Sequence, residues 1–242
     1  MKRPASLLLC ASLAFMGHAA TPDSSYIAGD HAAALKGYML LELDSASADL
    51  YYNIGNCHFK LGNKAEAVLW YERAYRLSPG DADIRTNLDL ARAQVVDRIN
   101  AAPGIAIGGG LSTWMAGRTI DTWAIRSLWA CSATFVLLAA SLFVGTTVRR
   151  GLRIAAALAG VFALLAFGLA ARRSSAVRDT SQAVIMSPKV DVKSEPRDSG
   201  TTVFVLHEGT KVSVTSTNAA WCEIELANGT VGWMKQADLE RI

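Results

Sequence analysis

The residue types that could do chemistry in this chain are few and far apart. His and Cys each occur four times, but no CxxC pair or His–Cys cluster has the spacing of a zinc site. The pair His207-Glu208 lacks a second His at metal-binding spacing. No His stands in a recognisable arrangement with a Ser or Cys nucleophile. We therefore expect no catalytic, cofactor-binding or metal-binding residue, and a protein that is not an enzyme.

Two further patterns exclude other classes of ligand. The run Gly108–Gly110 is not followed by Lys-Ser or Lys-Thr, and no strand precedes it, so a phosphate-binding loop is not expected. A net charge of +3 is too small to indicate nucleic acid binding. Cys57 and Cys222 are expected to be small buried side chains, because nothing in their spacing requires a disulfide.

The aromatic pair Trp221 and Trp233 could bind a ligand by stacking. If exposed, the two rings suit a peptide or a glycan. In so small a C-terminal segment, however, Trp is usually part of the core, and this is the interpretation we favour. The pair remains the tentative binding site of that segment.

Helices must position any other binding residue. The stretch 48–79 predicts a helix–turn–helix in which small residues let the helices touch. It resembles one complete tetratricopeptide repeat, with Gly55 in the first helix, Gly62 at the turn, and the second helix marked by Ala67, Tyr71, Ala74 and Pro79. The resemblance implies a concave, non-catalytic surface that holds other proteins.

This repeat has partial neighbours. Gly29, Ala34, Tyr38 and Leu41 have the spacing of a second repeat helix whose first helix is mostly missing, and 81–96 predicts a closing helix with Ile84, Leu88 and Ala91 on one face. We assign residues 23–99 to this domain. So short a stack is expected to lean on a partner, a second copy or a membrane.

The resemblance also places a binding groove on the first helix of each repeat. It implies these groove residues: Tyr52, Asn56, Phe59, Lys60, Asp83, Thr86, Asn87 and Leu90. Asn56 and Asn87 stand where carboxylate-clamp repeats hold a peptide carboxylate, but Tyr52 replaces the Lys of that clamp. A bound peptide segment is expected, and a true clamp is left as an alternative.

The N-terminus has the pattern of an export signal over residues 1–20. Lys2 and Arg3 precede an apolar run of about ten residues, which is too short to span a bilayer, and small residues follow at 17–20. The alternative is an uncleaved anchor.

Two uncharged runs predict a transmembrane hairpin. After a linker or interfacial segment at 100–121, we expect spans at 122–148 and 154–171, joined by a cytoplasmic loop at 149–153 that contains three Arg, and then a linker at 172–181. Trp114, Trp123 and Trp129, before and within the first run, suit an interfacial belt, and Ala155, Ala159 and Ala163 suit close helix packing. Two buried helices of a soluble domain are the alternative.

Orientation follows from charge. A cleaved signal and the three loop Arg place the domains on both sides of the hairpin outside the cytoplasm, in a periplasm, although Arg172 and Arg173 count against this.

The segment 182–242 has short strand-like runs and the hairpin signal Asn228-Gly229. It resembles the bacterial SH3-like domain through 192–196, 206–212, Trp221 and Gly232-Trp233. The expected fold class is thus a multidomain membrane protein, with an α-helical repeat domain, a two-helix hairpin and a small all-β barrel.

The order of these parts resembles the BatE family of the Bat aerotolerance system. That resemblance implies a scaffold in the bacterial inner membrane, with von Willebrand A domain proteins, and indirectly a MoxR-type ATPase, as partners. It implies no cofactor. A cell-wall-binding protein that holds peptidoglycan with its SH3-like domain is the alternative function.

Overall fold

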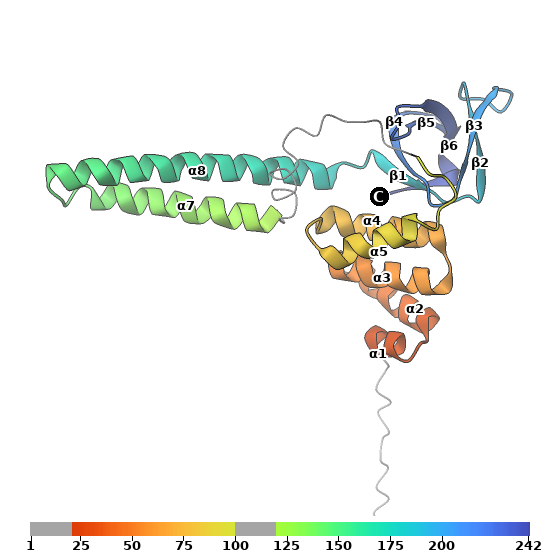
Figure 1. Ribbon diagram of the computed structural model, residues 1–242, viewed down its shortest axis with the longest axis horizontal. Helices are drawn as coiled ribbons and strands as arrows, with labels where there is room; N and C mark the ends of the chain where they lie inside the picture. The colour runs from red at the N-terminus through yellow and green to blue at the C-terminus, as the bar shows by residue number, and fades with distance from the viewer. Residues whose placement is uncertain (1–20, 100–119) are drawn as a thin grey trace, which may run out of the picture.

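A computed structural model describes residues 21–99 and 120–242. The expected signal at 1–20 and most of the linker at 100–121, including Trp114, lie outside the described residues. The described chain forms a helical domain, a long helical hairpin and a β-barrel (Figure 1).

The helical domain contains five helices in sequence order. They are α1 (Pro22–Ile27), α2 (His31–Glu42), α3 (Ala48–Leu61), α4 (Lys64–Leu77) and α5 (Ala82–Arg92). Side chains of Thr21, Asp30, Ser47 and Asp81 cap four of the N-termini by accepting main-chain N–H bonds. The helix α2 lies where the second helix of an earlier repeat is expected, and the short α1 precedes it.

Close contact between α3 and α4 depends on Gly55. A Cβ atom added there would lie 2.7 Å from the ring of Tyr71, so only glycine allows this approach. Gly62 ends α3 with φ +82, a left-handed conformation that suits glycine. The residues by which the repeat was predicted, Gly55, Gly62 and Tyr71, are thus the ones that form the contact and the turn between α3 and α4. The closing helix also buries Ile84, Leu88 and Ala91 as expected.

The C-terminal domain is a single antiparallel sheet of seven strands. They are β1 (Gln182–Ile185), β2 (Lys189–Lys193), β3 (Thr202–His207), β4 (Lys211–Asn218), β5 (Trp221–Glu225), β6 (Val231–Lys235) and β7 (Leu239–Arg241), in the spatial order β3-β2-β6-β5-β4-β1-β7. The expected turn at Asn228-Gly229 joins β5 to β6, with Gly229 at φ +84. The core contains Val192, Leu206, Ile224 and Met234.

The hairpin consists of α7 (Ile120–Ala140) and α8 (Thr146–Arg178). Its turn lies at residues 141–145, earlier than the expected loop at 149–153, because Gly145 begins α8 and the three Arg continue as helix. At 1.5 Å per residue α8 is about 50 Å long. It extends beyond α7 and leads directly into β1, while the far end of the hairpin projects away from both folded domains (Figure 1).

Both helices are long and apolar enough to cross a membrane. The candidate spans are Thr122–Ala140 and Thr146–Arg172, and only 6% and 17% of their most apolar windows are buried within the protein. They are therefore not core helices of the described part of the chain. The stripe of α8 buried against α7 contains Ala156, Ala166 and Ala170, while the expected Ala155, Ala159 and Ala163 are partly buried.

Candidate functional site

The helical domain carries a groove of about 340 Å³ on its concave side, which we call the repeat groove. Its lining comes from α1, α3, α4 and α5 and is mainly aromatic and amide in character. The lining residues are Tyr26, Tyr52, Asn56, Phe59, Lys60, Tyr71, Asn87 and Leu90. Such a lining offers apolar contact area together with a few oriented polar groups, which suits a peptide segment.

Hydrogen bonds fix the polar groups at the floor of the repeat groove. The Tyr71 hydroxyl donates to Asn56 Oδ1 at 2.7 Å, and Asn87 Nδ2 donates to Asn56 Oδ1 at 3.0 Å and to the Tyr52 hydroxyl at 2.9 Å. Burial raises the pKa of Tyr71 well above its usual value, so the hydroxyl remains a donor. Both N–H groups of the Asn87 amide are thus in use within the protein. A carboxylate clamp would have to break these bonds, so the structure gives that alternative no support.

Most of the predicted groove residues line the groove, and two do not. Asp83 and Thr86 lie on α5 outside the lining, and the Thr86 hydroxyl donates to the carbonyl of Ala82 at 2.8 Å. Tyr26 and Tyr71 line the groove but were not predicted. The repeat pattern marks Tyr71 as a packing residue of the second helix, and Tyr26 belongs to a helix too short to predict. Whether a partner binds these residues remains a prediction.

The two Trp residues of the barrel lie on its outer face, so the expectation that they belong to the core is wrong. Alternation along β5 and β6 points Cys222, Ile224 and Met234 inward, and this turns Trp221 and Trp233 outward. Each ring is half-buried by its neighbours. Lys235 Nζ lies 5.6 Å from the centre of the Trp221 ring and 2.8 Å from Asp198. The pair forms a partly exposed aromatic surface on the barrel.

A second feature that the sequence did not predict is the contact between the repeat domain and the barrel. One apolar cluster crosses the boundary, in which Val184 and Ile242 of the barrel pack with Val68 and Val95 of the helical domain. A Cβ atom on Gly209 would lie 2.7 Å from Val95 Cγ2, so the two domains approach closely there. The barrel covers the end of the helical stack at α4 and α5 (Figure 1).

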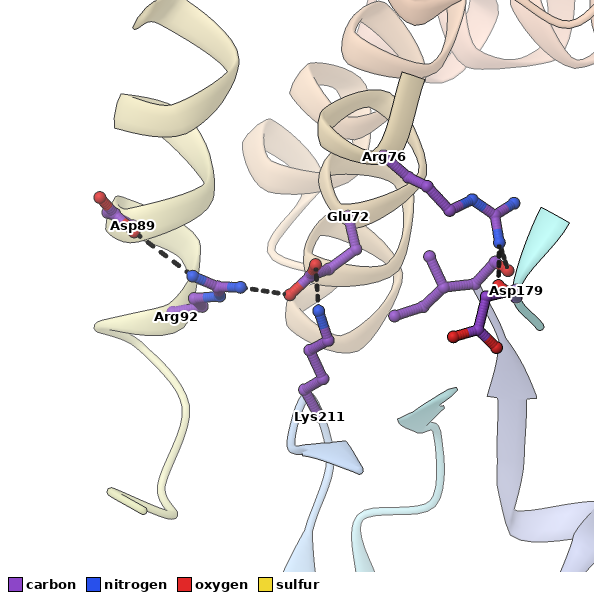
Figure 2. A network of polar contacts seen from close by, with 7 residues as sticks. Glu72, Arg76, Asp89, Arg92, Asp179 and Lys211 are labelled. Atoms are coloured by element: carbon purple, nitrogen blue, oxygen red, sulfur yellow. Dashed lines mark hydrogen bonds and ion pairs between the residues drawn. The ribbon is translucent and has the colours of Figure 1, made fainter. Parts of the chain in front are cut away.

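Ion pairs surround this apolar cluster. Glu72 of α4 is 2% exposed and accepts from Arg92 of α5 at 2.6 Å and from Lys211 of β4 at 2.8 Å (Figure 2). One carboxylate therefore joins two helices and the barrel. Nearby, Arg73 pairs with Glu240 at 2.7 Å, and Arg76 donates to main-chain oxygens of Asp179 and Ile242.

Asp97 makes a further set of bonds across the boundary. Its carboxylate accepts from the main-chain N–H of His207 at 2.6 Å and from the Thr210 hydroxyl at 2.8 Å, and His207 Nδ1 lies 2.9 Å away. Burial alone raises the pKa of Asp97, but the hydrogen bonds from His207 and Thr210 outweigh it and hold the pKa below its usual value. The ionised carboxylate thus favours the docked arrangement.

The remaining predicted features have simple outcomes. Cys57 and Cys222 are buried free thiols, as expected. Trp129 is exposed but lies near the middle of the candidate span Thr122–Ala140, and Trp123 is buried against α8 at Ala166 and Ala170, so the interfacial belt stays a prediction. Within residues 21–99 and 120–242, no three His, Cys, Asp or Glu side chains lie close enough together to hold a metal ion.

Comparison with known proteins agrees with the two folded domains. Residues 48–81 match the tetratricopeptide repeat family, and residues 188–240 match the bacterial SH3 domain family. No curated protein gives a significant match to the chain. The architecture is therefore a helical repeat domain, two candidate membrane helices and an all-β SH3-like domain, and both folded domains are of types used for binding.

Proposed function

We propose that this protein is a non-catalytic, membrane-anchored scaffold that binds partner proteins through its repeat groove. One observation carries the proposal. The repeat domain and the barrel pack into one body at one end of an apolar hairpin, and the repeat groove remains open on that body. A rigid head of this kind presents a binding site at a fixed place relative to a bilayer, which raises the effective concentration of membrane partners.

The sequence order supports a more specific version of the proposal. Its resemblance to the BatE family suggests a bacterial inner membrane, a head in the periplasm, and von Willebrand A domain proteins as direct partners, with a MoxR-type ATPase acting indirectly. The protein would then act in envelope integrity or stress tolerance, and it would bind neither a cofactor nor nucleic acid.

Photo-crosslinking in intact membranes tests the groove. A photoreactive residue in place of Leu90, which is exposed in the repeat groove, should give a defined adduct with a partner protein. The matched control replaces Leu43, which is also exposed but lies outside the groove lining. Equal crosslinking from both positions, or none from Leu90, would count against partner binding in the groove.

Peptidoglycan binding by the barrel is the second candidate function, favoured by the outward position of Trp221 and Trp233. The full-length protein in detergent should then sediment with purified cell wall, and the W221A/W233A variant should stay in the supernatant. The control V203A/V231A removes two other exposed apolar side chains of the barrel. If the wild-type protein stays in the supernatant, this candidate is excluded.

A further inference from the structure

The far end of the hairpin carries a cluster of Arg residues that have no acidic partner among the residues that the structure describes. Between Asp121 and Asp179 the sequence contains seven Arg and no Asp, Glu or Lys. Three of them, Arg149, Arg150 and Arg153, lie in the first turns of α8, beside the turn that joins the two helices. Their counter-charge must therefore come from outside the hairpin.

These Arg residues line an open pocket on one side of α8. The pocket has a volume of about 340 Å³, and Thr146, Ile154 and Ala157 complete its lining. Arg150 is exposed. Arg149 donates to the carbonyl of Val144 at 3.0 Å, while its buried Nε atom has no hydrogen-bond partner among the described residues. The pocket thus combines cationic donors with an apolar floor.

The Arg cluster lies at the N-terminus of α8, and this position favours a bound anion further. The N-terminus of a helix carries partial positive charge and main-chain N–H groups without intrahelical partners. Gly145 provides no side-chain cap there. Cations near this end raise the local potential further, so an anion would relieve both effects.

The surroundings of the cluster indicate what the anion belongs to. Leu142 and Phe143, in the adjacent turn, are 67% and 88% exposed, and Val148 and Ile154 are exposed on α8. A free phosphate ion would leave this apolar surface in water. A phospholipid would cover it with acyl chains while its phosphate meets the guanidinium groups.

We propose that Arg149, Arg150 and Arg153 form a binding site for the phosphate headgroup of an anionic phospholipid. This rests on the proposed membrane hairpin. Bidentate bonds from the guanidinium groups hold the headgroup, and the exposed side chains of the turn lie among the acyl chains of the same leaflet. The site fixes the depth of the hairpin in the bilayer at the end opposite the folded head.

Native mass spectrometry of the full-length protein in neutral detergent tests the site, with phosphatidylglycerol or phosphatidylcholine added at equal concentration. The wild type should retain phosphatidylglycerol at least about tenfold better, because its headgroup keeps a net negative charge beside the three Arg residues, whereas the choline of phosphatidylcholine neutralises the phosphate. R149Q/R150Q/R153Q should lose this preference. The matched control R126Q/R172Q/R178Q removes three Arg that lie away from the turn and should keep it. Equal retention of both lipids by the wild type would overturn the proposal, and so would unchanged preference in the first variant.

Three further measurements keep the result decisive. If the triple variant does not accumulate, R150Q changes one exposed side chain and should lower the preference two- to threefold, and no change would overturn the site. Inorganic phosphate in excess should not displace the lipid, and full displacement would show a simple anion site.

A carbonate wash of membranes separates the two proposals. Protein that stays in the pellet without lipid preference refutes this site alone, whereas wild-type protein released by carbonate refutes the hairpin as well.

Discussion

At the scale of single residues, Glu72 has the most consequential position in the described chain. It is nearly fully buried, and Arg92 and Lys211 bring two charges to it from different elements. Arg92 and Lys211 are both partly exposed and can turn to solvent, so the cost of removing the charge of Glu72 is the loss of its two charge-assisted hydrogen bonds. Glu72 therefore couples α4, α5 and the barrel.

We predict that E72Q lowers the free energy of unfolding by about 1–3 kcal/mol, because the amide can replace neither ion pair. Denaturant titration of the full-length protein in detergent measures this. The control is D89N, which removes the other acidic partner of Arg92, a mostly exposed carboxylate 3.5 Å away. Its effect should stay within about 0.5 kcal/mol. A similar loss of unfolding free energy in both variants would mean that the ion pairs of Glu72 contribute no more than the exposed pair of Asp89.

Asp97 should make the docking of the barrel sensitive to acid. Its pKa is held below the usual value in the folded protein, so its contribution is present above the unfolded pKa of about 3.9 and disappears as the pH falls through the folded pKa. We predict that wild type exceeds D97N in unfolding free energy by about 1–2 kcal/mol at pH 6, and that the difference narrows between pH 4 and pH 3.

Unfolding curves of the two proteins at pH 6, 4 and 3 give this difference directly. The control D198N alters an exposed carboxylate that pairs with Lys235 and should show almost no difference from wild type at any of these values. A wild-type to D97N difference that stays constant from pH 6 to pH 3 would contradict the proposed role of the ionised carboxylate.

At the scale of elements, the local sequence pattern was enough to predict the structure wherever residues close in sequence are also close in space. The spacing of Gly55, Gly62 and Tyr71 predicted the α3–α4 pair, and Asn228-Gly229 predicted the β5–β6 hairpin. The outward position of Trp221 could have been read from the alternation with Cys222 and Ile224. The preference for Trp in small cores led instead to the wrong face.

The docking of the barrel could not be predicted in this way. Glu72 has the character of an ordinary exposed helix residue until Lys211 is placed beside it, and Asp97 meets His207 across more than a hundred residues. Such contacts depend on how whole domains pack. The sequence led us to expect that the short stack leans on a partner, a second copy or a membrane, but in the structure it packs against the chain's own β-domain, which was not among these candidates.

Gly209 allows the contact between these two elements to be tested. Gly209 and Gly229 have φ of +83 and +84, so an Ala at either position carries a backbone strain of about 1 kcal/mol. Only Gly209 also faces a neighbour, Val95, in the helical domain. We predict a loss of about 2–4 kcal/mol for G209A and about 1 kcal/mol for G229A.

Thermal or denaturant unfolding compares the two variants, and hydrogen exchange in α4 and α5 shows where the difference arises. In G209A the amides of both helices should exchange faster, because the barrel no longer covers the end of the stack. Equal stability losses, or faster exchange confined to the barrel, would indicate that the domains are not held together at this point.

At the scale of the whole molecule, domain packing and membrane crossing constrain each other. The segments on either side of the hairpin fold into one body, so both must lie on the same side of any bilayer that the hairpin enters. The number of crossings between them must therefore be even. Opposite sides would break the apolar cluster and every ion pair that joins α4 to the barrel.

Single-cysteine labelling in spheroplasts tests this arrangement in a background with Cys10 and Cys131 replaced by Ser, since Cys57 and Cys222 are buried. Cysteines in place of Ser45 and Glu225 occupy exposed positions in the repeat domain and the barrel, and Thr147 is exposed at the far end of the hairpin. We predict that S45C and E225C react with an impermeant maleimide added outside, whereas T147C reacts only after permeabilisation. Labelling of S45C and E225C from opposite sides would be incompatible with the docked head. Labelling of both from the inside alone would keep the head intact and reverse the proposed orientation, and with it the choice of periplasmic partners.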